Sequence, residues 1–251
     1  MLKLLKYDWK RNATMSLAGL IILLVAQIVN LTVGWRNGWN EQFVIVIACL
    51  LFFFSGFLVF LMACQTFGAN LKAYSRRLLP LPTIYTIASP LVLMFGLSLV
   101  LFLVFAAFDA VFAAMYDKEA SFLSLLAEQL TFGEAALAIA LAIWGSLFTS
   151  LVIFFSMAFS RIVEGKGGTF LGIIVCILIF VTVPWVEDIL FSPEQIYGLI
   201  RLSPLESGNG SMTLTFGSAN SLEWLTLAFE AGVLICLIYG TIFLIERRIK
   251  L

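Results

Sequence analysis

Four polar side chains interrupt the longest apolar stretches of this sequence: Gln27, Asn30, Gln65 and Glu230. An acid inside a hydrocarbon environment is costly, so Glu230 is a functional-site hypothesis. It has no His, Lys or Arg three or four residues away, and it lies about two turns into its stretch, where it could simply reach a water-filled vestibule. Functional and structural interpretations of Glu230 therefore both stay open. Gln27, Asn30 and Glu230 together form a candidate substrate path.

The sequence offers little else that could do covalent chemistry. It contains no His, which removes the usual general base and the commonest metal ligand. Its four Cys residues stand singly in apolar stretches, so neither a disulfide framework nor a zinc site is indicated. No GxxxxGKS/T, HExxH or GxSxG motif occurs. We expect no catalytic residue, no metal ligand, no enzyme activity and no nucleic-acid partner in this chain.

The composition is typical of a membrane protein: 62% of the residues are hydrophobic, 12% are charged, and the mean hydropathy is +1.06. Six apolar runs approach the ~20 residues that a bilayer core requires. They are Met15 to Val33, Phe43 to Phe67, Leu91 to Phe108, Leu137 to Phe159, Thr169 to Val183 and Leu225 to Ile245. We therefore predict an all-α polytopic membrane protein with six transmembrane helices, residues 1–251 forming a single transmembrane domain.

Basic residues fall almost entirely on one side of these six spans. When successive connections are assigned to alternate sides, twelve of the fifteen Lys and Arg residues share one side. They are Lys3, Lys6, Lys10, Arg11, Lys72, Arg76, Arg77, Arg161, Lys166, Arg247, Arg248 and Lys250. By the positive-inside rule this side is cytoplasmic. Both termini are thus predicted to lie in the cytoplasm.

The residues ahead of the first span form a short basic amphipathic pattern. Leu2, Leu5 and Trp9 recur at helical spacing, and three Lys residues recur with similar spacing on another face. The residues expected at the membrane interface are Lys3, Lys6, Trp9 and Lys10. The pattern predicts an N-terminal amphipathic elbow helix in the headgroup layer, with its Lys side chains facing anionic lipid. These Lys residues could also act only as a topology signal, and the two roles are compatible.

The second span continues past its apolar run into a basic segment. Gly68 to Arg77 favours a helix, which the two prolines of Leu78 to Pro82 end. A plain positive-inside turn needs only a few Lys or Arg residues, whereas this segment adds a Tyr, an apolar pair and the prolines. We favour a docking element for another protein over a plain turn, because loops on a rigid scaffold often carry function. The candidate docking residues are Asn70, Lys72, Tyr74, Ser75, Arg76 and Arg77.

Two outer loops carry helix signals. In residues 186–222, a Ser cap, a Pro at the first helical position and a Gln three residues after the cap predict a helix near Pro193 to Leu202. This helix either folds back toward the bilayer, capping an exit path, or lies flat at the interface. The other loop, residues 109–134, has apolar residues at helical spacing from Phe122 to Leu130, which predicts an interfacial helix.

This layout resembles the ABC-2 type permeases, the membrane subunits of type V-fold ABC exporters. The resemblance covers the whole chain: an elbow, six spans with both ends inside, a coupling helix after the second span and a helical loop before the sixth. The most specific local matches are Tyr74 to Pro82, similar to the Leu-Pro stretch after the coupling helix of short bacterial members, and Leu202-Ser203-Pro204. Pro90 departs from the pattern, because many relatives carry a Lys there.

The resemblance implies a permease that dimerises, with itself or a similar chain, and is driven by separate ABC ATPase subunits that bind ATP and Mg. The docking segment would then be the coupling helix between spans two and three. Short bacterial members resemble exporters of peptides such as lantibiotics. The expected cargo is therefore amphipathic, a peptide, an antibiotic or a lipid-like molecule, moved out across a bacterial cell membrane.

Two other classes of protein stay open. A self-contained secondary carrier or channel would use Glu230 as a proton-linked site and predicts inverted repeats, which the sequence does not show. A membrane scaffold for a signalling complex would keep the docking segment and need no substrate path. In an ATP-driven permease, Glu230→Gln should be nearly silent, whereas a proton-coupled carrier would lose all transport.

Overall fold

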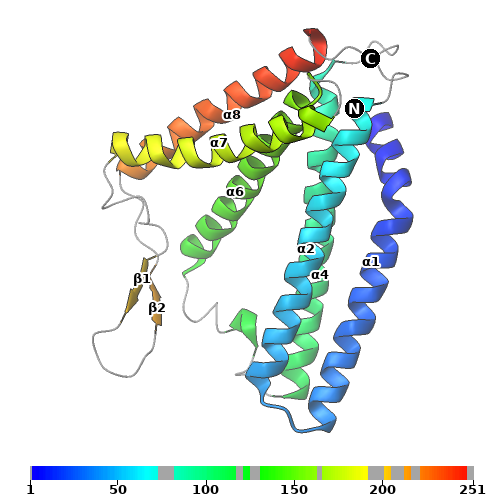
Figure 1. The fold of residues 1–251 in the computed structure, drawn as a ribbon. Coiled ribbons are helices and arrows are strands. Elements are labelled where there is room, and N and C mark those ends of the chain that lie inside the picture. Colours follow the sequence, from blue (N-terminus) through cyan, green and yellow to red (C-terminus); the bar gives the residue numbers. More distant parts are fainter. Residues whose placement is uncertain are drawn as a thin grey trace. The chain divides into compact units, whose positions relative to one another are not determined.

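A computed structural model gives the fold of the chain (Figure 1). It describes residues 2–72, 82–116, 121–124, 131–162, 166–191, 201–204, 212–215 and 221–247. Contacts between residues divide the chain into two units, Met1–Ile143 with Leu251, and Trp144–Lys250. Each unit has its own packing, and the single transmembrane domain expected from the sequence stays a prediction.

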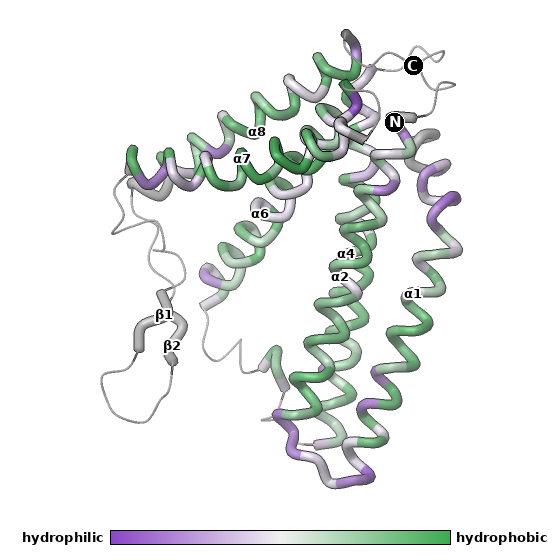
Figure 2. The backbone as a smooth tube through the Cα atoms, in the orientation of Figure 1, coloured by the Kyte–Doolittle hydropathy of each residue, from purple (hydrophilic) through white to green (hydrophobic). Residues whose placement is uncertain are grey.

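Six long helices make up most of the described residues. They are α1 (Leu2–Arg36), α2 (Glu41–Lys72), α4 (Ile84–Met115), α6 (Phe132–Phe159), α7 (Lys166–Phe191) and α8 (Ser221–Arg247). Each contains an apolar stretch long enough to cross a bilayer, which confirms the predicted multi-pass helical membrane fold. In unit 1, hydrophobic residues follow the middle of α1, α2 and α4, and hydrophilic residues gather toward the helix ends (Figure 2).

The helices leave most of their apolar surface uncovered. Within the most apolar window of each span, between 6% and 28% of the residues are buried. Phe53 of α2 is 78% exposed and Ile177 of α7 is 58% exposed. Such extensive apolar exposure is not tolerated in water, and a lipid bilayer or a second protein satisfies it.

In unit 1, α1, α2 and α4 pack side by side (Figure 1). The turn from α1 to α2 uses Gly38, whose φ of 62° is the left-handed conformation that glycine adopts freely. Close to this turn, a Cβ on Gly34 would lie 2.7 Å from Val44 Cγ2 and 2.9 Å from the Tyr116 hydroxyl. Glycine at position 34 therefore allows α1 to approach α2 and the end of α4 closely.

Two apolar clusters fill unit 1. One joins α1, α2 and α4 near the Gly38 turn, and the other joins α2 to α4 further along. Their buried members are Leu31, Val44 and Phe112 in the first, and Val59, Met62, Ala63, Leu93, Met94 and Leu97 in the second. Phe52 of α2 adds edge-to-face contacts with Phe105 and Phe108 of α4, at centroid distances of 5.1 and 5.9 Å.

In unit 2, α6 and α8 run in the same direction beside each other. Trp144 of α6 donates a hydrogen bond to Glu230 of α8. Further along both helices, Gly240 of α8 lies against the ring of Phe155 of α6, where an added Cβ would be 2.9 Å from a ring carbon. Buried residues of α8 recur at positions 234, 237, 241 and 244, which is one helical face. Gly172 of α7 lies close to Ser160, just after the end of α6, where a Cβ added to Gly172 would be 2.7 Å from Ser160 Cβ.

Unit 2 also contains a small antiparallel hairpin. Strands β1 (Arg201–Pro204) and β2 (Met212–Thr215) pair with Arg201 opposite Thr215 and Pro204 opposite Met212. The sequence predicted that Arg201 and Leu202 end a helix, and the structure corrects this. The residue before Pro204 disfavours helical backbone, and the Thr-rich partner strand favours sheet. Residues 192–200, the rest of that predicted helix, lie outside the described residues.

Three further boundaries differ from the sequence predictions. The elbow is not a separate helix, because α1 runs unbroken from Leu2 to Arg36, about 52 Å against a hydrocarbon core of ~30 Å. Helix α4 begins at Ile84 and contains Pro90, so the third span starts earlier than expected. It also continues to Met115, which places Asp109 on a helix rather than in a loop. Of the predicted interfacial helix, residues 122–124 are helical, and 125–130 lie outside the described residues.

Candidate functional site

Asp8 is the centre of the most extensive polar contacts in unit 1. It is fully buried although it stands near the start of α1. Its Oδ2 accepts hydrogen bonds from Ser89 Oγ at 2.7 Å and from Asn70 Nδ2 at 3.2 Å, and its Oδ1 lies 3.6 Å from Arg11 Nη2. A buried carboxylate needs such partners to offset the loss of water. These contacts tie α1 to both α2 and α4.

Neighbouring side chains extend this set of bonds. Asn12 Nδ2 donates to Thr66 Oγ1 at 2.8 Å, and Arg11 Nη2 donates to the carbonyl oxygen of Thr66 at 3.4 Å and to Asn70 Oδ1 at 3.5 Å. We call the six residues the Asp8 cluster: Asp8, Arg11, Asn12, Thr66, Asn70 and Ser89. The cluster lies on the basic, predicted cytoplasmic side, where buried and partly buried hydrogen bonds join three helices.

The predicted elbow residues lie on either side of Asp8 in the first turns of α1. Lys6 and Lys10 are exposed, and Trp9 is 45% exposed with its ring 3.8 Å from where a Cβ on Gly96 would lie. The side chain of Lys3 lies outside the described part of the chain. A helix start with exposed Lys residues and a partly exposed Trp suits the headgroup layer. Contact with anionic lipid stays a prediction.

The predicted docking residues are only partly described. Helix α2 does continue past the apolar run, to Lys72. Asn70 is 4% exposed and faces Asp8, so its side chain is engaged within unit 1 and is not presented to another protein. Tyr74, Ser75, Arg76 and Arg77 lie outside the described residues. Docking through this segment therefore stays a prediction, with Asn70 removed from its contact surface.

Gln27 and Asn30 of the candidate substrate path connect α1 to α2. Gln27 Nε2 donates to the carbonyl oxygen of Ala48 at 3.2 Å, and Asn30 Nδ2 donates to that of Val44 at 3.1 Å. Both side chains are buried, and their amide oxygens have no hydrogen-bond partner among the described residues. Interhelical bonds of this kind stabilise packing in membranes by about 1–2 kcal/mol at most. These two residues therefore link α1 to α2, and their part in a substrate path stays a prediction.

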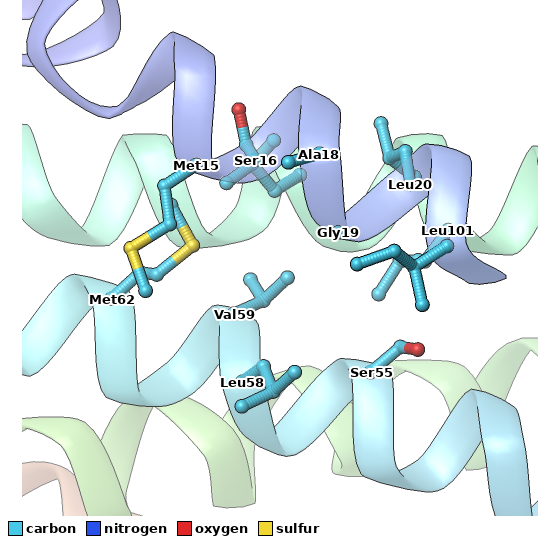
Figure 3. A pocket seen from close by; sticks show the side chains of 12 residues that line it. Met15, Ser16, Ala18, Gly19, Leu20, Ser55, Leu58, Val59, Met62 and Leu101 are labelled. Carbon is cyan, nitrogen blue, oxygen red and sulfur yellow. The ribbon is translucent and has the colours of Figure 1, made fainter.

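An apolar cavity of about 270 Å³ lies between α1, α2 and α4. Along α1 it lies between the Asp8 cluster and Gln27. Met15 and Met62 lie together at one end and Leu20 and Leu101 at the other (Figure 3). The two Ser hydroxyls in its wall donate to carbonyl oxygens of their own helices, at 3.0 and 2.9 Å. With no free polar group in the wall of this cavity, it suits a hydrocarbon chain and not an ion.

Glu230 has a partner on another helix. Trp144 Nε1 of α6 donates a hydrogen bond to Glu230 Oε2 of α8. Glu187 of α7 is 6% exposed, and its Oε1 has no hydrogen-bond partner among the described residues. Glu187 and Glu230 both lie within the apolar spans of their helices. Residue spacing along α8 could not predict the bond between Glu230 and Trp144, because Trp144 lies on another helix.

Asp109 holds the chain that follows α4. Its carboxylate accepts hydrogen bonds from Ser121 Oγ at 2.6 Å and from the backbone N–H groups of Phe122 and Leu123 at 2.8 and 3.1 Å. It thereby caps the helical turn at residues 122–124. Directly after α4, burial and the charge of Glu41 raise the pKa of Tyr116 above its ordinary value, so this phenol stays neutral at physiological pH.

Sequence reasoning missed Asp8, Ser89, Trp144 and Glu187. A signal did exist for Asp8, which is the sole acid in the first forty residues and stands in a basic helix. No comparable signal marks Trp144 or Glu187. No protein-family model, curated protein or solved structure matches the chain. Among the described residues, no group of three His, Cys, Asp or Glu side chains is placed to hold a metal ion.

Proposed function

We propose that the chain is the membrane permease subunit of an ATP-binding cassette exporter, moving an amphipathic molecule out of the cell or membrane. The layout carries this proposal: six spans, basic residues on one side, and a second helix that continues on that side as far as Lys72. This is the layout that resembles ABC-2 permeases. ATP would be hydrolysed by separate ATPase subunits, and a second permease chain, identical or similar, would complete the transporter in a bacterial cell membrane.

The packing supports a part that moves as a body. The Asp8 cluster joins α1, α2 and α4 by side-chain hydrogen bonds close to Lys72, where α2 ends. A push on the segment after Lys72 would therefore be transmitted to three helices and not to one. Rigid-body displacement of packed helices is a common way to couple two distant sites.

The experiment that tests the function is co-purification of an ATPase with the full chain from native membranes. Arg76→Glu with Arg77→Glu should abolish both the bound ATPase and the associated ATP hydrolysis, because the basic end of the docking segment would meet an acidic groove. The matched control is Lys6→Glu with Lys10→Glu, which makes the same change in charge on the predicted cytoplasmic side. Retention of the ATPase by the Arg76/Arg77 variant, or loss in both variants alike, would refute docking through this segment.

A secondary carrier is favoured by one observation: α7 and α8 each carry an acid within an apolar span, Glu187 and Glu230, and Glu187 is buried. It makes a different prediction. Purified chain in liposomes, with no ATPase present, would move cargo in response to a pH gradient, and Glu230→Gln would stop this movement. An ATP-driven permease shows no gradient-driven transport in the same liposomes.

A further inference from the structure

The apolar cavity of unit 1 ends next to an arginine. Three of the α1 residues that line it recur at helical spacing and share one face: Met15, Ala18 and Ile22. Arg11 lies on the same face, one turn before Met15. Its Nη2 donates to the carbonyl oxygen of Thr66 at 3.4 Å, and Thr66 lies one turn from Met62 on α2. The guanidinium group therefore stands beyond the end of the cavity where Met15 and Met62 lie together (Figure 3).

The cavity has a buried floor and an exposed rim. Val59, Met62 and Leu97 in its wall are 9%, 5% and 5% exposed. Met15 and Ile22, also in its wall, are 58% and 68% exposed. The exposed apolar side of a membrane-spanning helix faces lipid or another protein. The cavity can therefore be entered from the surrounding bilayer, in the part of α1 that follows Arg11.

The size of the cavity decides between these two kinds of occupant. An apolar cavity of about 150 Å³ already takes up benzene, so about 270 Å³ holds part of a hydrocarbon chain. One turn of an α-helix with its side chains is about 10 Å wide and 5.4 Å long, and fills more than about 400 Å³. A helix of a second protein is thus too large to enter, and a single acyl chain fits.

Arg11 offers donors to a negatively charged headgroup. Its side chain is 32% exposed, and within the described ranges its contacts with Asp8, Thr66 and Asn70 all use Nη2. The charge of Asp8 is shared with two further donors, Ser89 and Asn70. The other N–H groups of the guanidinium suit the oxygens of a phosphate, which arginine binds in a fork geometry. Anionic lipids are concentrated in the cytoplasmic leaflet, the side on which Arg11 is predicted to lie.

We propose that Arg11 and the cavity between α1, α2 and α4 form a binding site for one anionic phospholipid of the cytoplasmic leaflet. Arg11 holds the phosphate, and one acyl chain lies in the cavity, from Met15 and Met62 toward Leu20 and Leu101. This site differs from the attraction of exposed Lys residues to a negatively charged membrane surface, which needs no cavity. It does not depend on the proposed export function.

The test is native mass spectrometry of the delipidated full chain in detergent, titrated with phosphatidylglycerol. Two control ligands each lack one half of the molecule: diacylglycerol has the same chains without the phosphate, and glycerol 3-phosphate has the phosphate without chains. We expect saturable binding of one phosphatidylglycerol and at least about tenfold weaker binding of diacylglycerol, because the contact with Arg11 is lost. Glycerol 3-phosphate should not compete, because most of the contact area belongs to the chain.

Two pairs of variants separate the chain from the headgroup. Gly19→Leu fills the cavity, since Gly19 lines it and an added Cβ meets no atom within 4 Å. Gly56→Leu is its control, because Gly56 of α2 has equally open surroundings and is not in the cavity wall. Gly19→Leu should weaken phosphatidylglycerol about tenfold, and Gly56→Leu should leave it unchanged. Arg11→Gln should weaken it about tenfold but not diacylglycerol, whereas Lys10→Gln, with the same loss of charge, should change it less than about twofold.

Several results would overturn the proposal. Wild-type binding by Gly19→Leu excludes a chain in the cavity, and equal binding of phosphatidylglycerol and diacylglycerol excludes a role for the phosphate. If phosphatidylglycerol does not bind and Gly19→Leu converts a dimer into a monomer, the cavity is an interface between two copies of the chain instead. If Arg11→Gln fails to fold, the control ligands on the wild-type protein and the Gly19→Leu variant still decide. Absence of a co-purifying ATPase removes the export proposal and leaves this lipid-binding result intact.

Discussion

Replacing Asp8 by Ala should destabilise unit 1 more than any other single polar substitution in it. The change leaves Ser89 Oγ, Asn70 Nδ2 and the Arg11 guanidinium without the carboxylate that now accepts from them or pairs with them. The two buried donors, Ser89 and Asn70, cost about 1–3 kcal/mol each when they are left without an acceptor, and the exposed Arg11 adds little. Ser89→Ala removes a single hydrogen bond to a charged acceptor, 2.7 Å long, and should cost about 1.5–3 kcal/mol.

The free energy of unfolding of the purified full chain in mixed micelles measures both effects. Because the two groups are bonded directly, the double variant should lose less than the sum of the single losses, with a coupling energy of about 1–3 kcal/mol. Asp188→Asn is the control, since Asp188 is exposed and a surface substitution usually stays within about 0.5 kcal/mol. Strictly additive losses, or a loss below about 1 kcal/mol for Asp8→Ala, would show that the Asp8 cluster does not hold the three helices together.

Two further predictions concern close approach and helix capping. Gly34→Ala should lower the free energy of unfolding by about 1–3 kcal/mol, because its Cβ would meet Val44 Cγ2 at 2.7 Å, whereas Gly19→Ala, with no atom within 4 Å, should be neutral or stabilising. Thr131 and Glu134 form a capping box, each bonding the backbone N–H of the other. Thr131→Ala should cost about 0.5–2 kcal/mol in the same unfolding measurement, and an unchanged value would contradict the capping role.

Hydropathy could predict the six helices because a bilayer imposes one requirement on every span, a run of apolar residues of sufficient length. It could not predict their ends, because polar residues continue a helix wherever their side chains find partners. Asp8 shows this: it extends α1 ahead of the apolar run, but its partners Asn70 and Ser89 come 62 and 81 residues later. The strand at Arg201 to Pro204 was missed for the same reason, since its pairing with β2 is not local.

The candidate substrate path illustrates the limit for functional residues. Spacing along one helix identified Glu230 as an acid without a partner, and the structure supplies Trp144 from α6. Gln27 and Asn30 were grouped with Glu230 because all three are polar within apolar runs. The two amides bond to α2 within unit 1, and Glu230 belongs to unit 2, so a path that includes all three stays a prediction.

The cost of leaving each buried oxygen without a partner distinguishes structural from functional polar groups in this chain. An unpaired amide oxygen, as in Gln27 or Asn30, costs about 1–3 kcal/mol, which the packing of a helix pair can offset. A buried carboxylate without a partner, as in Glu187, costs several kcal/mol more when it is ionised. In the Asp8 cluster the chain provides Ser89, Asn70 and Arg11 as partners of the buried acid, whereas the described residues provide none for Oε1 of Glu187. The Asp8 carboxylate is therefore explained by helix packing, and packing among the described residues does not explain the Glu187 carboxylate.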